Sequence, residues 1–138
     1  MLVYLDSSAL LKRVLREDHA AALRTRLSEL ADGPHELLTS TLGWVEITRA
    51  LKTRAERAGE RPGDQNAKAL AGVSGYPVSY EVISLARKIG PQELRSLDAI
   101  HCATASLTDC DLLISYDRRM LDAAALIGFA TESPGVGA

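Results

Sequence analysis

The chain begins with the apolar run Met1-Leu2-Val3-Tyr4-Leu5, and the polar stretch Asp6-Ser7-Ser8 follows it directly. A short run without polar interruption that contains valine and tyrosine is typical of a strand buried on both faces. The side chains after it are of the kinds that cap helices, and apolar residues at helical spacing continue through residues 9–15. This opening predicts a buried strand, a polar turn and a helix, the first unit of an α/β fold.

The alternation of strands and helices continues along the chain. Further strands are predicted at residues 37–39, 76–79, 112–115 and 129–131, and the second of these is an edge strand because it contains Pro77. Helical spacing predicts helices at residues 19–30, 42–58, 67–73, 80–89, 97–107 and 118–127, with Ser40 or Thr41 and Ser96 as caps. Together these elements predict an α/β fold with a mainly parallel sheet.

The composition is that of one compact domain. The 138 residues suit a single domain, which we expect to span residues 1–133 with a mobile tail at 134–138. The net charge of −2 includes no basic arm, so a nucleic-acid partner needs a local patch of positive charge. No apolar stretch is long enough to span a bilayer, and the two cysteines, Cys102 and Cys110, form no CxxC pair. We therefore expect a cytoplasmic protein with reduced thiols and no zinc site.

Four acidic side chains are expected at one edge of the predicted sheet. Asp6 directly follows the first strand, and Asp117 lies just after the strand at residues 112–115. Glu46 lies in the first turns of the helix after the second strand, and Asp98 lies in the first turn of the helix at residues 97–107. Open parallel sheets bind ligands beyond the carboxyl ends of their strands, and helix N-termini favour ionised carboxylates. The four acids are therefore expected to share one small volume.

Such a cluster needs a cation. Two carboxylates about 4 Å apart repel each other by roughly 4 kcal/mol at an effective dielectric constant of 20. Carboxylate oxygens suit the hard ions Mg²⁺ and Mn²⁺, whereas only Asp98 has a histidine and a cysteine close to it in the sequence. A purely acidic pocket with one or two hard cations is typical of enzymes that cleave phosphodiester bonds with metal-activated water.

Each acid also has an ordinary structural explanation when it is taken alone. Asp6 and Asp117 can cap helices, whereas Glu46 can lie on a solvated helix face. Asp98 can interact with a helix dipole. A phosphotransfer enzyme with Asp6 as its nucleophile fits poorly, because a haloacid-dehalogenase-like site needs a second aspartate where Ser8 stands. A response-regulator-like site fits poorly too, because residues 129–131 contain no lysine.

The four acids lie in four distinct stretches, namely residues 3–10 (VYLDSSAL), 40–46 (STLGWVE), 97–105 (LDAIHCATA) and 113–121 (LISYDRRML). In this order, the stretches resemble the motifs of PIN-domain proteins, specifically the VapC-like toxins of bacterial toxin–antitoxin pairs. Ser115 stands where the family usually has threonine and keeps the hydroxyl group. The order and approximate spacing agree over nearly the whole chain, so the resemblance is specific.

The resemblance implies a three-layer fold with a five-stranded, mainly parallel sheet flanked by helices. It also implies a Mg²⁺- or Mn²⁺-dependent endoribonuclease, frequent homodimers and a cognate antitoxin that occupies the pocket. On the matching positions, Asp6 and Asp98 are the expected direct metal ligands, and Glu46 and Asp117 complete the set directly or through water. Three hydroxyl side chains are expected to orient the carboxylates or nearby backbone, namely Ser7, Ser8 and Ser115.

Other polar residues near these motifs have less defined expected roles. Arginines that follow the acids could guide RNA phosphates, and the candidates are Arg118, Arg119, Arg13 and Arg49. His101 is three residues after Asp98 and could be taken for a general base, but we expect a packing or surface role. The alternative function is a non-catalytic module that binds RNA or protein, and the intact set of four acids speaks against it.

Overall fold

The protein folds around one five-stranded sheet in which every strand is parallel to its neighbours. The computed structural model describes residues 1–61 and 63–137. The strand order is β3-β2-β1-β4-β5, with bounds β1 (Leu2–Leu5), β2 (Glu36–Ser40), β3 (Val73–Tyr76), β4 (Leu112–Ile114) and β5 (Thr131–Glu132). The predicted α/β class and five-stranded parallel sheet are confirmed.

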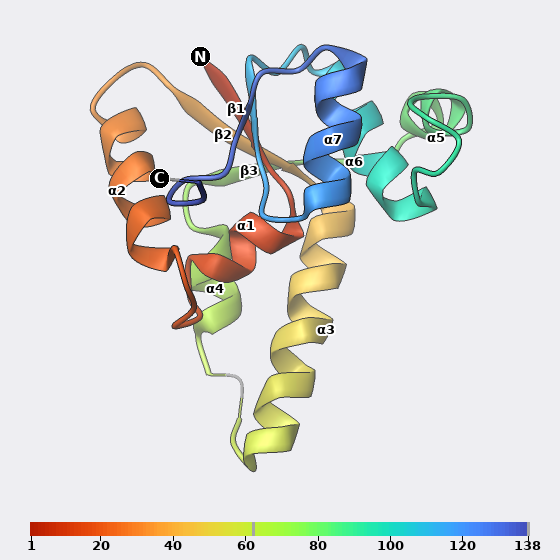
Figure 1. Cartoon of the computed structure of the whole chain (residues 1–138). Coiled ribbons are helices and arrows are strands. Elements are labelled where there is room, and N and C mark those ends of the chain that lie inside the picture. Colours follow the sequence, from red (N-terminus) through yellow and green to blue (C-terminus); the bar gives the residue numbers. More distant parts are fainter. Residues whose placement is uncertain (62, 138) are drawn as a thin grey trace.

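Helices cover both faces of the sheet, which gives three layers (Figure 1). One face carries α1 (Ser7–Lys12), α2 (Ala20–Ala31), α3 (Thr41–Ala58) and α4 (Gln65–Leu70). The other face carries α6 (Ser96–Leu107) and α7 (Arg118–Ile127), and α5 (Tyr80–Ala86) packs beside α6. The long helix α3 projects beyond the body of the molecule (Figure 1).

The central strand β1 joins the two hydrophobic layers. Val3, Tyr4 and Leu5 are fully buried, as the opening run predicted. Because side chains alternate along a strand, Val3 and Leu5 pack into the cluster beneath α1 to α4. Tyr4 packs on the opposite side, among residues of α6 and α7. The alternation places the one polar atom of this strand's buried side chains, the Tyr4 hydroxyl, under α6.

The edge strand lies earlier than the sequence predicted. We expected a helix at residues 67–73 and a strand at 76–79, whereas α4 ends at Leu70 and β3 spans Val73–Tyr76. Val73 pairs with Leu37 of β2, so a β-branched residue starts the strand. Pro77 lies just after β3, where its missing N–H removes no bond from the sheet. The predicted edge position was right, and the predicted bounds of the strand were wrong.

Smaller differences concern element ends. Ser96 is the first residue of α6, not its cap, and the cap residue Arg95 makes no side-chain hydrogen bond to the helix. The last strand is β5 at Thr131–Glu132 and not at residues 129–131. The Pro134 carbonyl accepts a hydrogen bond from the Tyr116 hydroxyl at 2.8 Å, so the first residue of the predicted tail contacts the body. Among the described residues, no helix is both long and apolar enough to cross a membrane.

Candidate active site at the carboxyl edge of the sheet

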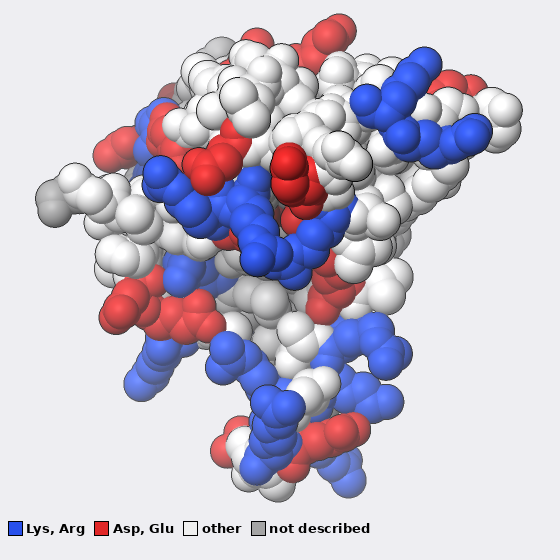
Figure 2. All heavy atoms as spheres, turned by 45° about the vertical axis from the view of Figure 1, so that its right-hand side comes forward, with Lys and Arg blue, Asp and Glu red and all other residues white. Residues whose placement is uncertain are grey.

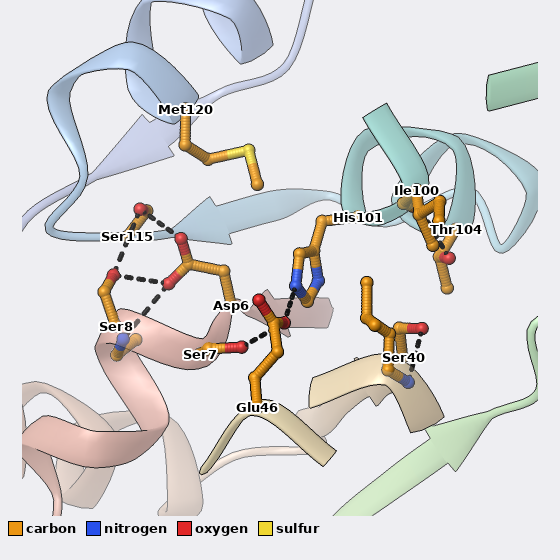
Figure 3. Close-up of polar contacts among 12 residues, drawn as sticks. Asp6, Ser7, Ser8, Ser40, Glu46, Ile100, His101, Thr104, Ser115 and Met120 are labelled. Atoms are coloured by element: carbon orange, nitrogen blue, oxygen red, sulfur yellow. Dashed lines mark hydrogen bonds and ion pairs between the residues drawn. The ribbon is translucent and has the colours of Figure 1, made fainter. Parts of the chain in front are cut away.

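Asp6 is held rigidly at the end of β1. It caps α1, and its Oδ1 accepts hydrogen bonds from the Ala9 N–H at 3.1 Å and from the Ser8 hydroxyl at 2.6 Å. The Ser115 hydroxyl, which follows β4, donates to Oδ2 (Figure 3). The side chain is only 4% exposed, and this burial raises its pKa despite the hydrogen bonds. Asp6 is therefore a carboxylate whose negative charge the fold alone stabilises incompletely.

Glu46 lies in the second turn of α3 and is held from two sides. The Ser7 hydroxyl and His101 Nε2 both contact its Oε1, at 2.5 and 2.6 Å (Figure 3). Partial burial raises the pKa of Glu46, but the His101 and Ser7 contacts outweigh this effect and the net shift is downward. Glu46 is thus an ionised carboxylate that is fixed through one oxygen.

His101 takes part in this network, contrary to the packing or surface role that we predicted. It is 2% exposed, and its Nδ1 lies 2.6 Å from the Tyr4 hydroxyl, which accepts a hydrogen bond from the Ser40 N–H. The helical spacing from Asp98 placed His101 near the acidic edge. The sequence does not show that both ring nitrogens have partners. The second partner, Tyr4, reaches the imidazole only because tertiary packing places its side chain beneath α6.

Asp98 and Asp117 lie at the N-termini of α6 and α7. Asp117 caps α7, and its Oδ1 accepts from the backbone N–H groups of Arg119 and Met120. Asp98 is partly buried, and its pKa is raised first by burial and then by the negative charges of Asp117 and Asp6. These effects place Asp98 within electrostatic range of both Asp117 and Asp6. The structure therefore brings carboxylates from four separate segments to one edge of the sheet.

The carboxylates do not yet form a closed ligand set. Within residues 1–61 and 63–137, no three acidic, histidine or cysteine side chains are placed so that they could hold a metal ion together. The chemistry of the donors still fits a hard cation, because the acidic groups are oxygen donors and the charges of Asp6 and Asp117 disfavour ionisation of Asp98.

The predicted RNA-contacting arginines lie in different surroundings. Arg118 and Arg119 are exposed at the start of α7, where Arg118 pairs with Asp122 at 3.3 Å. Arg49 is exposed on α3, and basic side chains gather over the projecting end of this helix (Figure 2). Arg13 donates to the Ala69 carbonyl at 2.7 Å, so an RNA contact would compete with this bond. RNA contact by these residues stays a prediction.

Comparison with known proteins bears on the family of the chain. The PIN domain family model matches residues 3–126. The chain is 39% identical over 137 residues to Ribonuclease VapC47 of Mycobacterium tuberculosis, covering 97% of this chain and 98% of that protein. It is 40% identical over 134 residues to Ribonuclease VapC46 of the same species, covering 96% of this chain and 97% of that protein. These alignments extend over nearly the full length of both partners.

Solved structures agree on the fold. VapC20 of Mycobacterium tuberculosis, described as a toxin that cleaves the sarcin–ricin loop, has a TM-score of 0.70 at 17% identity and covers 96% of this chain and 99% of its own. VapBC2 of Rickettsia felis, bound to a promoter DNA fragment, has a TM-score of 0.72 at 11% identity, with 96% and 98% covered. At these identities the likeness concerns the fold alone. From the match of the family model and the near-full-length relatives together, the chain belongs to the PIN-domain family.

Proposed function

We propose that this chain is a Mg²⁺- or Mn²⁺-dependent endoribonuclease and the toxin of a toxin–antitoxin pair. The relatives that it matches over nearly their full length are named ribonucleases. The observation that carries the proposal is the buried Asp6 carboxylate, which two serine hydroxyls orient at the edge of the sheet. Three further acids come from α3, α6 and the N-terminus of α7, and two of them, Asp98 and Asp117, lie within electrostatic range of one another.

The residues that would hold the cation are Asp6, Glu46, Asp98 and Asp117. Divalent-metal dependence is general among PIN-domain nucleases of this kind. The protein hydrogen bonds to Glu46 and Asp117 go to a single oxygen of each carboxylate in the described part of the chain, which leaves the other oxygen for a ligand. When bound, the cation would supply activation of water and neutralisation of charge on the scissile phosphate.

The protein groups themselves orient the site and attract the substrate. Ser8 and Ser115 fix the plane of the Asp6 carboxylate from two sides, and Ser7 fixes Glu46. Arg118 and Arg119 lie directly after Asp117 and are exposed, so their charges offset the repulsion between the acidic edge and RNA phosphates. Hydrolysis would add water across one phosphodiester bond of the RNA.

The antitoxin and the homodimer belong to the same proposal. A toxin–antitoxin complex from Klebsiella pneumoniae has the same fold, with a TM-score of 0.61 at 17% identity. Apolar side chains are exposed at the start of α3 and nearby, including Trp44 at 43%, Val45 at 55% and Tyr80 at 83%. Such side chains suit a protein partner. We place the protein in the cytoplasm, where RNA and a newly made antitoxin are both available.

The test is RNA cleavage by the pure protein. Incubation with total cellular RNA and Mg²⁺, followed by mapping of new RNA ends, should show defined cuts that EDTA abolishes. Asp6→Asn and Asp98→Asn should each lose at least about 100-fold in rate while remaining folded, in the range found when one group that stabilises the transition state electrostatically is removed. Asp32→Asn, which changes an exposed acid at the end of α2, should retain full activity.

Two results would count against the proposal. Metal-dependent cleavage that persists in both site variants would remove the acidic edge from the reaction. Tight binding of RNA by the wild-type protein without any cleavage, with or without Mg²⁺ or Mn²⁺, would favour the non-catalytic module instead.

A further inference from the structure

We propose that His101 is a positioning residue of this site, which fixes the Glu46 carboxylate for the cation through a hydrogen bond from its Nε2. The inference rests on the proposed function, because it takes Glu46 to be a metal ligand. It adds a residue outside the four acids and assigns that residue a defined partner.

The direction of the His101–Glu46 bond follows from the carboxylate. Oε1 of the ionised Glu46 can only accept, so His101 Nε2 carries the proton of this bond at 2.6 Å. On the other side of the ring, Nδ1 lies 2.6 Å from the Tyr4 hydroxyl. The Ser40 N–H can only donate, so the Tyr4 oxygen accepts its bond at 3.1 Å and Tyr4 is held in place in turn.

The proton on Nε2 then meets the site carboxylate. His101 Nε2 donates to Glu46 Oε1 at 2.6 Å, and the Ser7 hydroxyl donates to the same oxygen (Figure 3). Both donors lie on one side of the carboxylate, so Oε2 is left for a ligand. Metal-binding carboxylates are commonly oriented by such outer hydrogen bonds. The chain from the Ser40 backbone to Oε1 thus fixes Glu46 through β2, β1 and α6, and α6 also carries Asp98.

Burial makes this chain rigid. Tyr4 and Ser40 are fully buried and His101 is 2% exposed, so water cannot replace a missing partner. A buried polar chain with each of these contacts made holds its members in one arrangement. The competing explanation is that His101 only fills space and satisfies Tyr4. The two explanations differ in which nitrogen of the ring matters.

Two variants separate the nitrogens. In His101→Gln, the side-chain amide can reach Glu46 from the place of Nε2, whereas it offers Tyr4 no good partner. In His101→Asn, the shorter side chain presents its amide near the place of Nδ1 for Tyr4 and cannot reach Glu46. A role in packing or in satisfying Tyr4 predicts that asparagine is the better substitute, and a role in positioning predicts that glutamine is.

The main readout is Mn²⁺ binding without RNA, measured from the loss of the free Mn²⁺ resonance in electron paramagnetic resonance titrations. We expect His101→Asn to weaken Mn²⁺ binding by about 10- to 100-fold, the range for lost outer-shell partners, and His101→Gln to stay within about threefold of wild type. Cleavage rates of total RNA should follow the same order. Thermal unfolding in EDTA serves as the control for folding.

A second measurement needs no variant. A long-range proton–nitrogen correlation spectrum of the wild-type protein shows whether Nε2 of His101 carries a proton, with His19 and His35 as references. A ring without a proton on Nε2 would overturn the inference, and so would equal Mn²⁺ affinity of the asparagine variant and wild type. If wild-type protein binds no Mn²⁺ and cleaves no RNA, the proposed function fails together with the inference. If wild type does both and the variants do not differ, the inference alone fails.

Discussion

Replacement of Gly75 with alanine tests the contact between edge strand β3 and the start of α3. A Cβ built on Gly75 lies 2.2 Å from Cζ2 and 2.7 Å from Cε2 of the Trp44 indole. Since ordinary contacts begin near 3.4 Å, the indole or the strand must retreat by about 1.2 Å. Gly75 pairs with Thr39 in the sheet, so the strand cannot retreat without weakening its bonds to β2. The indole has to move.

The change in the free energy of unfolding is the difference between two opposing effects. Overpacking of this kind costs about 1–3 kcal/mol, and the lower half applies because Trp44 is 43% exposed and can turn toward solvent. Alanine recovers roughly 0.5 kcal/mol through its lower backbone entropy in the unfolded chain. We expect a net loss of about 1 kcal/mol in the free energy of unfolding. For a chain of this size, that corresponds to a fall in Tm of roughly 4 °C.

The assay is urea denaturation of Gly75→Ala in the wild-type and Trp44→Ala backgrounds. Without the indole the clash is absent, so Gly75→Ala should be neutral or slightly stabilising there. The coupling energy in this double-mutant cycle should reach about 1 kcal/mol. An equal loss in both backgrounds would refute the packing of Trp44 on β3, and so would an unchanged midpoint in the wild-type background.

Three more predictions follow from single features. Asp6→Asn should raise the free energy of unfolding at pH 7 in EDTA by about 0.5–2 kcal/mol. Burial raises the pKa of Asp6, so ionisation of this carboxyl group lowers the stability of the folded protein as the pH rises through that pKa. Denaturation curves at acid pH, where Asp6 is protonated, should therefore show no stability gain of Asp6→Asn over wild type. Arg26→Gln should lose about 0.5–1 kcal/mol, because Arg26 makes two bonds to Glu132, at 2.7 and 2.9 Å, that tie α2 to β5. The difference should shrink in 1 M salt as the pair is screened, and a loss independent of salt would contradict this origin. Burial raises the pKa of Cys102 to about 12 and of Cys110 to about 11. At pH 8 fewer than roughly one in a thousand of either thiol is ionised. Iodoacetamide labelling of the native protein should therefore be no faster than the local unfolding that exposes the two buried thiols.

The positions of the acids could be predicted from the sequence because each depends on local structure. Asp6 and Asp117 follow buried strands, and both serve as helix caps. In a parallel sheet, the ends of strands meet at one edge whatever the details of packing. The polarity of the chain and the periodicity of its apolar residues therefore suffice to place these two side chains. The position of Asp98 could be predicted once the start of α6 was known, because this residue lies in the first turn of the helix.

The hydrogen-bond partners of the acids could not be predicted in the same way. The contact of His101 with Glu46 joins residues 55 apart in the sequence, and its contact with Tyr4 joins residues 97 apart. Such contacts depend on the distance between α6 and the sheet, which the summed packing of many side chains sets. The predicted bounds of β3 were wrong for a related reason. A short edge strand has weak local preferences, and its pairing with β2 decides where it begins.

The location of these partners bears on how the site can hold four negative charges in a small domain. Asp6 has its charge stabilised by hydroxyl groups and one backbone N–H, and burial still raises its pKa. Glu46 has a lowered pKa, because the His101 and Ser7 contacts outweigh its partial burial. The fold thus keeps one carboxylate fully ionised and leaves another in need of a counter-charge. A cation that binds at this edge would gain the most free energy from Asp6, because the protein stabilises the charge of this carboxylate least. Glu46 is already ionised and would serve as a further ligand.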